Sequence, residues 1–231
     1  VMKELDNIPN EIDEKDIKNR TDLRDVELFT IDGDDAKDLD DAVSLKMLEN
    51  GNYELGVHIA DVSFYVKENT EIDKEAYNRG TSVYLVDRVL PMLPHKLSNG
   101  ICSLNGGVDR FAISCIMEIN DKGNVVNYNV FPSVIRSKLR MTYKKVNDIL
   151  DKNIVDELYK PFEKTLRNMK KLSDILRENK RRRGYIDFEI PEVKILVDEK
   201  GKPIELAKRE QGTGEKLIED FMIAANETVA T

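Results

Sequence analysis

Short apolar runs bounded by polar residues recur near the start of the chain. Residues 27–31, 42–47 and 53–59 each form such a run, which is typical of β-strands. Asn50-Gly51 separates the last two runs and favours a hairpin turn. The pattern therefore predicts three neighbouring strands.

A second pair of β-rich runs covers residues 111–119 and 125–139. The turn sequence Asp121-Lys122-Gly123-Asn124 lies between them and predicts a long antiparallel hairpin. Pro132 has no backbone N–H, so we expect it at a sheet edge or a bulge. Further short strands are expected at residues 81–86, 186–190, 193–197 and 204–206.

Apolar residues recur at spacings of three and four between residues 143 and 183, which predicts helix there. A shorter helix is expected from Thr70 to Arg79, because Gly80 supplies a stop signal. A last helix begins near Glu215 and reaches Thr231 without a stop signal, so we expect the chain to be part of a longer protein. The apolar face of the long helical region carries Phe162, Leu166, Met169, Leu172 and Leu176.

These elements predict an α+β fold in which mixed or antiparallel sheets pack against helices. Residues 1–26 hold many charges and few large apolar side chains, so we expect them to form a linker or arm and not a core element. Residues 27–231 are then the folded domain. The sequence shows no internal repeat.

Composition narrows the class of protein. Of 231 residues, 40% are hydrophobic, which is enough for a core, and the net charge is −8, so a phosphate-binding surface must be local. The two cysteines form no CxxC pair, which argues against a structural zinc site. No apolar stretch reaches the ~20 residues of a membrane span, and the start lacks a signal peptide. We expect a soluble protein of the cytoplasm that does not contact a membrane.

The most informative motif lies between the first two predicted strands, where six of the ten residues from Asp32 to Asp41 are aspartate. Crowded carboxylates repel one another, and protonation or a divalent cation relieves the repulsion. An EF-hand does not fit, because Lys37 and Val43 stand where its loop needs Gly and Glu. The run therefore indicates a hard-metal site, with a solvated acidic loop as the alternative.

Further motifs in a fixed order extend this interpretation. The chain resembles the catalytic domain of the ribonuclease II/ribonuclease R (RNB) family over about residues 20–231, and it is closer to bacterial ribonuclease R than to ribonuclease II. On this resemblance the fold is an RNB-type domain that lacks its C-terminal part. The motifs that carry the resemblance are Thr30-Ile31-Asp32-Gly33-Asp34-Asp35-Ala36-Lys37-Asp38-Leu39-Asp40-Asp41-Ala42, His58-Ile59-Ala60-Asp61-Val62-Ser63, Arg79-Gly80-Thr81-Ser82-Val83-Tyr84, Pro91-Met92-Leu93-Pro94 and Leu97-Ser98-Asn99-Gly100-Ile101-Cys102-Ser103-Leu104.

The resemblance implies an activity and its metal. The family hydrolyses single-stranded RNA processively from the 3′ end and releases nucleoside 5′-monophosphates, with Mg²⁺ as cofactor and Mn²⁺ as an alternative. Asp32, Asp38, Asp40 and Asp41 match the four functional acids of the family. Asp32 and Asp41 are expected to be direct metal ligands, Asp38 to support the metal, and Asp40 to matter most for the chemistry. Asp40 and Asp38 are thus the catalytic residues that we expect, and all four acids form the metal site.

The resemblance also implies residues that bind RNA. Tyr84, Tyr143 and Phe188 match family aromatics that stack on bases, and each stack contributes roughly 1–3 kcal/mol. Glu219 matches an acid near the terminal ribose. Core packing is an equally good explanation of Tyr143 and Phe188.

Two other features leave alternatives open. Residues 160–183 include ten basic and three acidic side chains, which fits an RNA-backbone contact or the solvated face of an amphipathic helix. His58 lies in an apolar strand pattern and His95 in a Pro-rich loop, so packing or solvent exposure is favoured over a role as general base.

The complete enzymes of the family carry RNA-binding barrels and a downstream arginine-rich motif that this chain lacks. We therefore expect a monomer with weak or no activity by itself, whose partner is the 3′ end of single-stranded RNA. The alternative is a non-catalytic RNA-binding or regulatory relative with the same fold. Retention of all four aspartates favours the enzyme.

Overall fold

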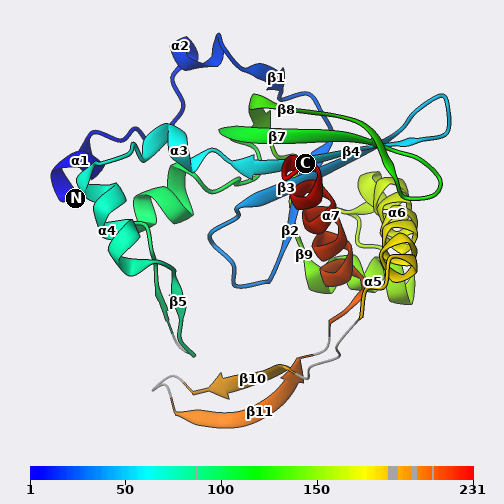
Figure 1. Ribbon diagram of the computed structural model, residues 1–231. Coiled ribbons are helices and arrows are strands. Elements are labelled where there is room, and N and C mark those ends of the chain that lie inside the picture. The colour runs from blue at the N-terminus through cyan, green and yellow to red at the C-terminus, as the bar shows by residue number, and fades with distance from the viewer. Residues whose placement is uncertain (87, 187–191, 199–201, 210) are drawn as a thin grey trace.

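The central element of the computed structural model is a mixed seven-stranded sheet (Figure 1). The structure describes residues 1–86, 88–186, 192–198, 202–209 and 211–231. The strand order is β1-β8-β7-β4-β3-β2-β9, in which β1–β8 and β2–β9 are parallel pairs and the other neighbours are antiparallel. The strands are β1 (Thr21–Leu23), β2 (Leu28–Asp32), β3 (Asp41–Met47), β4 (Tyr53–Ala60), β7 (Asp109–Ile119), β8 (Val125–Arg136) and β9 (Arg140–Thr142).

The strands β2, β3, β4 and β7 confirm the predicted runs, whereas the strand predicted at residues 125–139 ends at Arg136 as β8 and is followed by β9, which was not predicted. In a flat sheet these two strands would lie about 24 Å apart, at about 4.8 Å for each of five spacings. The link from Arg136 to Arg140 spans at most about 14 Å. The sheet therefore curls, and Lys138 in the link donates its N–H to the Leu28 carbonyl of β2 at 2.8 Å. Pro132 lies beyond the part of β8 that β1 covers, Ser133–Ile135, so its predicted edge position is confirmed.

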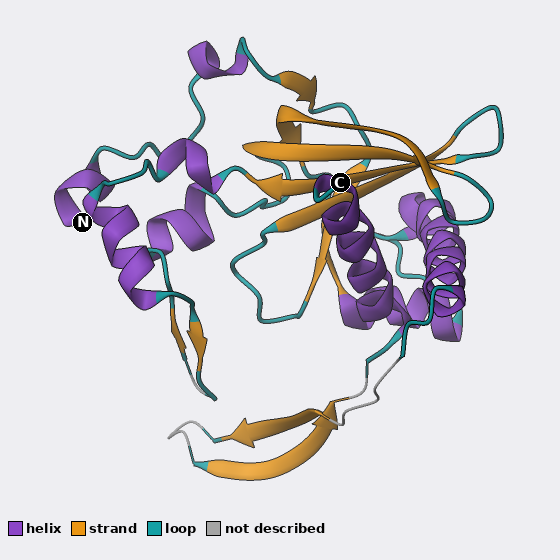
Figure 2. Ribbon diagram, viewed as in Figure 1, coloured by secondary structure: helices purple, strands orange, loops and turns teal. Residues whose placement is uncertain are grey.

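Three helices pack on one face of the sheet and form the main core (Figure 2). They are α5 (Tyr143–Lys152), α6 (Glu163–Arg182) and α7 (Thr213–Val229), and a single 3₁₀ turn, η2 (Lys160–Phe162), precedes α6. The predicted helical region divides because Asn153 adopts a left-handed conformation (φ 58°) that ends α5. The predicted apolar face of α6 is confirmed, since its four apolar members within the helix are buried in this core.

A smaller cluster lies at the other end of the sheet, beside the N-terminus (Figure 1). It joins α1 (Met2–Asp6), α3 (Val62–Tyr65), α4 (Glu71–Arg79) and the π-helical turn η1 (Lys96–Ile101), while α2 (Glu14–Ile17) precedes β1. The predicted helix α4 is confirmed, with Thr70 as N-cap and Gly80 at φ 72° after its last residue.

The expectation that residues 1–26 contain no core element is wrong. Ile8 is buried in the smaller cluster, and β1 forms one edge of the sheet. Arg20 lies 2.6 Å from Asp61 in an ion pair whose side chains are 8% and 6% exposed. Leu5, Ile8 and Ile12 recur at spacings of three and four and all belong to this cluster, but the pattern is short, and only tertiary contacts show where it packs. The division of the chain at residue 26 stays a prediction.

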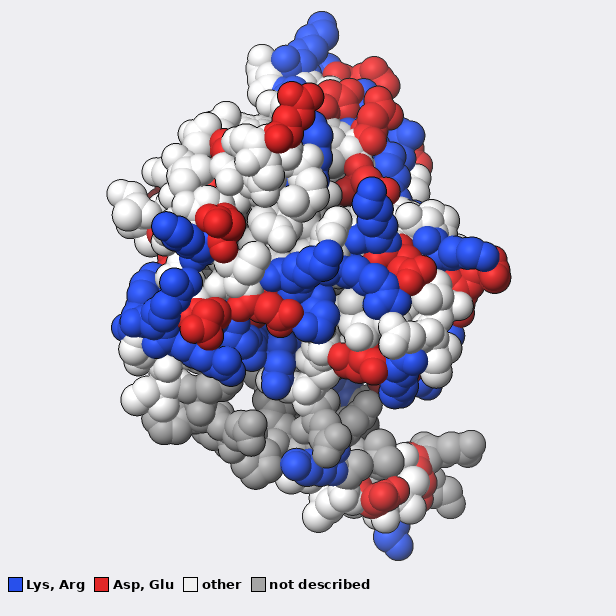
Figure 3. Space-filling model, turned by 90° about the vertical axis from the view of Figure 1, so that its right-hand side faces the viewer, with Lys and Arg blue, Asp and Glu red and all other residues white. Residues whose placement is uncertain are grey.

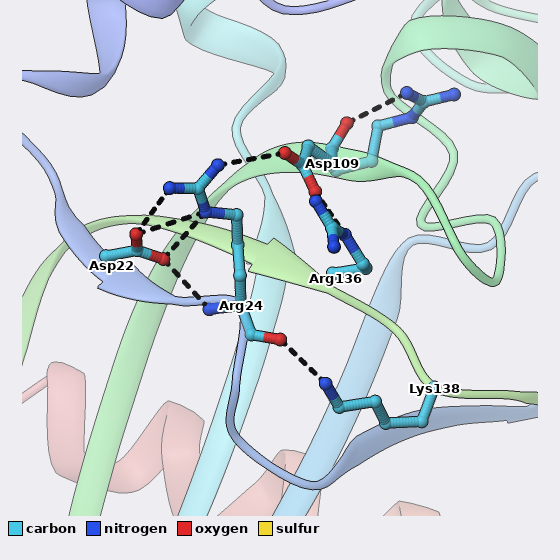
Figure 4. A network of polar contacts seen from close by, with 6 residues as sticks. Asp22, Arg24, Asp109, Arg136 and Lys138 are labelled. Carbon is cyan, nitrogen blue, oxygen red and sulfur yellow. Dashed lines mark hydrogen bonds and ion pairs between the residues drawn. The ribbon is translucent and has the colours of Figure 1, made fainter.

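A network of ion pairs fastens β1 to the hairpin of β7 and β8 (Figure 4). Arg24 binds Asp22 at 2.6 Å and Asp109 at 3.2 Å, and Arg136 binds Asp109 at 2.6 Å. The hydrogen bonds from Arg24 lower the pKa of Asp22 to about 2. Burial works to raise the pKa of Asp109, but the two arginines outweigh it and hold that pKa below its ordinary value.

Two hairpins extend from the body on the same side (Figure 1). β5 (Val83–Tyr84) pairs with β6 (Val89–Leu90), so the strand expected at residues 81–86 is only two residues long. β10 (Glu192–Val197) pairs with β11 (Pro203–Arg209), which confirms two predicted strands. Most of the strand predicted at residues 186–190 lies outside the described residues. Within the described part of the chain, no helix combines the length and the apolar character that a membrane span requires.

Candidate functional site

The aspartate run folds as a loop between two antiparallel strands. Asp32 is the last residue of β2, and Asp41 is the first residue of β3. The register Phe29↔Val43 brings the end of β2 beside the start of β3. The two carboxylates therefore lie at the same end of the strand pair, with residues 33–40 looping between them.

The carboxylates of this corner are harder to ionise than ordinary aspartates. Burial, then the charge of Asp41, raises the pKa of Asp32 to about 7. Burial, then the charge of Asp40, raises the pKa of Asp41 to about 6. Burial, then the charge of Asp38, also raises the pKa of Asp40 above its ordinary value. The sequence predicted the repulsion between the carboxylates, and the structure adds their desolvation as the larger cause.

Asp32 and Asp41 also leave oxygen atoms without partners. The Oδ2 atoms of both side chains are buried and accept no hydrogen bond among the described residues. An uncompensated buried carboxylate oxygen is costly, and a hard divalent cation prefers such oxygen ligands. These two side chains fit a Mg²⁺ or Mn²⁺ ion.

The other two acids lie in the loop and have different surroundings. The Oδ2 atom of Asp38 accepts a hydrogen bond from the Tyr84 hydroxyl at 2.7 Å, and this bond raises the pKa of Tyr84 to about 12. Asp40 is more exposed than Asp32 and Asp41, although neighbouring groups still desolvate its carboxylate enough to raise its pKa, and its carbonyl accepts the Ala60 N–H at 2.9 Å. Within the described part of the chain, no three acidic, histidine or cysteine side chains converge as a ready metal-binding group. The four aspartates therefore do not form a ready metal-binding group among the described residues, and their role as metal ligands stays a prediction.

A groove of about 700 Å³ lies beside the aspartate loop. Tyr84 and Tyr143 both line it, so the structure brings together two of the expected RNA-stacking residues. Tyr84 is 66% exposed, whereas Tyr143 begins α5 and packs partly against the main core. Tyr143 therefore contacts both the groove and the core, which fits either interpretation of it.

Glu215 also lines this groove, although the sequence directed attention to Glu219. Its Oε2 atom accepts bonds from Asn147 Nδ2 at 2.9 Å and the Gly212 N–H at 3.0 Å. An acid three residues into a helix is the available sequence signal for such a cap. Glu219 is half-buried, and its Oε1 atom lies 4.0 Å from Lys180 Nζ. Its expected ribose contact stays a prediction, and Phe188 lies outside the described residues.

His58 is packed, as the sequence favoured. It is fully buried and lies between Ser44 Oγ at 3.1 Å and Ser114 Oγ at 2.7 Å. Burial lowers the pKa of His58 to about 4, so the imidazole is neutral near pH 7. His58 is therefore part of a hydrogen-bonded chain within the sheet.

Lys and Arg side chains gather on the face shown in Figure 3, with fewer Asp and Glu side chains among them, and the basic residues of α6 outnumber its acidic ones. Arg167 pairs with Glu163 at 2.8 Å and Lys170 with Asp174 at 2.7 Å. Lys180 is bound inside the fold to the buried Asp220 at 3.3 Å. Much of the local positive charge is thus compensated, and both interpretations of this run remain open.

Comparison with known proteins agrees with this arrangement. The model of the RNB domain family matches residues 20–231. The chain belongs to the RNB domain family. This result confirms the resemblance drawn from the motifs.

Members of the family include ribonuclease R of Thermotoga maritima, which is 54% identical over 231 residues, 100% of this chain and 32% of that protein. The structure of Mycoplasma genitalium RNase R in complex with ribose methylated single-stranded RNA superposes with a TM-score of 0.93 at 35% identity, over 99% of this chain and 35% of the other. Yeast Ssd1, a pseudonuclease, shares the fold with a TM-score of 0.71 at 19% identity, over 95% of this chain and 26% of its own. These structures confirm the expected α+β fold, and the chain spans about a third of the length of such relatives.

Proposed function

We propose that this chain carries the metal-binding half of an exoribonuclease active site. The substrate would be the 3′ end of single-stranded RNA, degraded processively to nucleoside 5′-monophosphates. The observation that carries the proposal is the pair of buried, unpartnered carboxylate oxygens on Asp32 and Asp41 beside a groove that two tyrosines line. The relationship to ribonuclease R supports it.

The residues of this chain have separate tasks in the proposed reaction. Asp32 and Asp41 would hold Mg²⁺ or Mn²⁺, and Asp38, whose carboxylate accepts the Tyr84 hydroxyl, would support the metal. When bound, the metal supplies Lewis-acid stabilisation of the phosphate charge and a more acidic water. Asp40 orients the attacking water, whose oxygen bonds to phosphorus while the bond to the departing 3′ oxygen breaks. Tyr84 and Tyr143 hold the terminal bases by stacking.

The chain alone should bind metal but cleave RNA slowly. Relatives are about three times as long, so groups that complete the active site in a longer protein would not all be present in this chain. A group that stabilises the transition state typically contributes about 10²–10³-fold in rate. Its absence would leave an incomplete active site.

A non-catalytic RNA-binding role is the second candidate. It is favoured by the absence of a converged three-ligand metal group within the described part of the chain. The fold itself is compatible with both roles, since yeast Ssd1 shares it. Retention of four aspartates in the family's register favours catalysis.

The decisive experiment compares this chain with a chimera in which it replaces the matching segment of Thermotoga maritima ribonuclease R. Each protein receives 3′-labelled single-stranded RNA with Mg²⁺ or with chelator, and circular dichroism confirms folding. We expect the chimera to release labelled mononucleotide in Mg²⁺ only, and Asp40→Asn to slow it about 10²–10³-fold. Undiminished activity in chelator or in Asp40→Asn would overturn the metal mechanism. A folded chimera that binds RNA without cleaving it would establish the second candidate.

A further inference from the structure

Buried polar atoms without partners are concentrated at one place in the fold. The described part of the chain has five such side-chain atoms, and four of them surround Asp32. Native proteins provide hydrogen-bond partners for nearly all buried polar atoms. A concentration of unpartnered atoms therefore indicates a functional site or one that a bound ion or ligand completes. The four atoms are Thr30 Oγ1, Asp32 Oδ2, Asp41 Oδ2 and Arg140 Nε.

Arg140 belongs to this group through strand pairing. The parallel register of β2 and β9 places Thr30 beside Arg140 and Ile31 beside Met141. Ile31 and Met141 are buried in the main core, and side chains alternate between the faces of a sheet. Thr30, Asp32 and Arg140 therefore share the opposite face.

Arg140 is also tied to the loop that carries the other acids. Its Nη2 atom donates to the Gly33 carbonyl at 3.1 Å and to the Asp34 carbonyl at 2.8 Å. Gly33 follows Asp32 directly and has open space around its Cα, so its backbone is intrinsically free to move. The two bonds from Arg140 fix the loop at the point where it leaves β2.

We propose that Arg140 is a positioning residue of the aspartate site, which anchors the Gly33–Asp34 backbone so that Asp32 stays beside Asp41. The inference rests on the proposed metal site. Arg140 contacts backbone carbonyls and not the metal, so it acts through the geometry of the loop.

Charge and geometry predict opposite effects of removing Arg140. A positive charge beside the site repels a second cation, so neutralising it should by Coulomb's law tighten metal binding. Loss of the loop anchor should weaken metal binding, since removal of a group that orients the ligands typically costs 10–100-fold in affinity. The direction of the change therefore separates the two roles.

The test measures Mn²⁺ binding by isothermal titration calorimetry on the 231-residue chain and three variants. We expect Arg140→Gln to weaken binding about 10–100-fold. Arg140→Lys keeps the charge and an ammonium that can donate to both carbonyls, so it should recover most of the affinity. Arg167→Gln, which removes the same charge from a surface pair on α6, should bind as the unmodified chain does. Thermal unfolding in chelator confirms that each variant is folded.

A second readout uses the chimera. Because the defect lies in metal affinity, raising the Mn²⁺ concentration should restore the activity of Arg140→Gln, which it would not do for a general loss of structure. Equal or tighter Mn²⁺ binding by Arg140→Gln overturns the proposal, as does Arg140→Lys binding no better than Arg140→Gln. If the unmodified chain binds no Mn²⁺, the proposed metal site itself fails.

Discussion

Two groups of aspartates on the same sheet have opposite electrostatics. Asp22 and Asp109 lie among arginines, and both have lowered pKa values (Figure 4). Asp32 and Asp41 lie at the end of β2 and β3 with raised pKa values and a buried unpartnered oxygen each. Where acids serve the fold, the chain supplies its own cations. At the aspartate loop it leaves the negative charge largely uncompensated, as a site for an external cation would require.

The largest expected effect that separates the two groups is on catalysis. In the chimera, Asp41→Asn should lower the rate of RNA hydrolysis about 10²–10³-fold, because a metal ligand is lost. Asp22→Asn should leave the rate within about twofold, because its carboxylate serves only Arg24. The measurement is release of labelled mononucleotide under single-turnover conditions. Equal losses in both variants would erase the distinction.

Metal binding should stabilise the protein through Asp32 and Asp41 and not through Asp22 and Asp109. At a Mn²⁺ concentration 100 times the dissociation constant, binding stabilises a folded protein by about 2.7 kcal/mol. For a chain of this size each kcal/mol raises the melting temperature by about 2–4 °C. We expect this rise in the unmodified chain and in Asp22→Asn, and its loss in Asp32→Asn and on addition of chelator. A rise that survives in Asp32→Asn would place the ion elsewhere.

In chelator, neutralising each group should change stability in opposite directions. Asp32→Asn removes an uncompensated, largely buried charge and should raise the melting temperature at pH 8 by about 2–4 °C. Asp109→Asn weakens the ion pairs with Arg24 and Arg136 and should lower the stability by about 1 kcal/mol or less. Differential scanning calorimetry gives both values. Destabilisation by Asp32→Asn would show that its carboxylate is already compensated.

The two groups should also differ in how stability depends on pH. The pKa of Asp32 rises from 3.8 to about 7 on folding, so the folded state binds more protons and stability falls as pH rises from about 4 to about 7. The pKa of Asp22 falls to about 2, so its contribution is present above about 4 and is lost as pH drops towards 2. Urea unfolding in chelator should show a flatter profile between pH 4 and 7 for Asp32→Asn. Asp22→Asn should lower stability evenly above about pH 4 and change the slope of the profile only at its acidic end.

Much of the fold followed from local patterns. Alternating and clustered apolar residues predicted β2, β3, β4 and β7, and Gly80 correctly marked the end of α4. The end of β8 at Arg136 and the separate strand β9 were missed, because the curl of the sheet that takes the chain from β8 to β9 is a property of all seven strands. The burial of Ile8 was missed for the same reason: its contacts come from helices far along the chain.

The sequence by itself determined the family, the four aspartates and the expectation of a hard cation, because ordered motifs and crowded carboxylates are readable without coordinates. Only the tertiary structure showed which aspartate oxygens lack hydrogen-bond partners, and that the Tyr84 hydroxyl donates a hydrogen bond to Asp38. The hydrogen bond from Arg140 to the Gly33 carbonyl also became visible only in the tertiary structure, because the parallel pairing of β9 with β2 brings together residues that are 107 positions apart. Residue types fix the available chemistry, whereas pairing between distant strands decides which groups meet and which remain uncompensated.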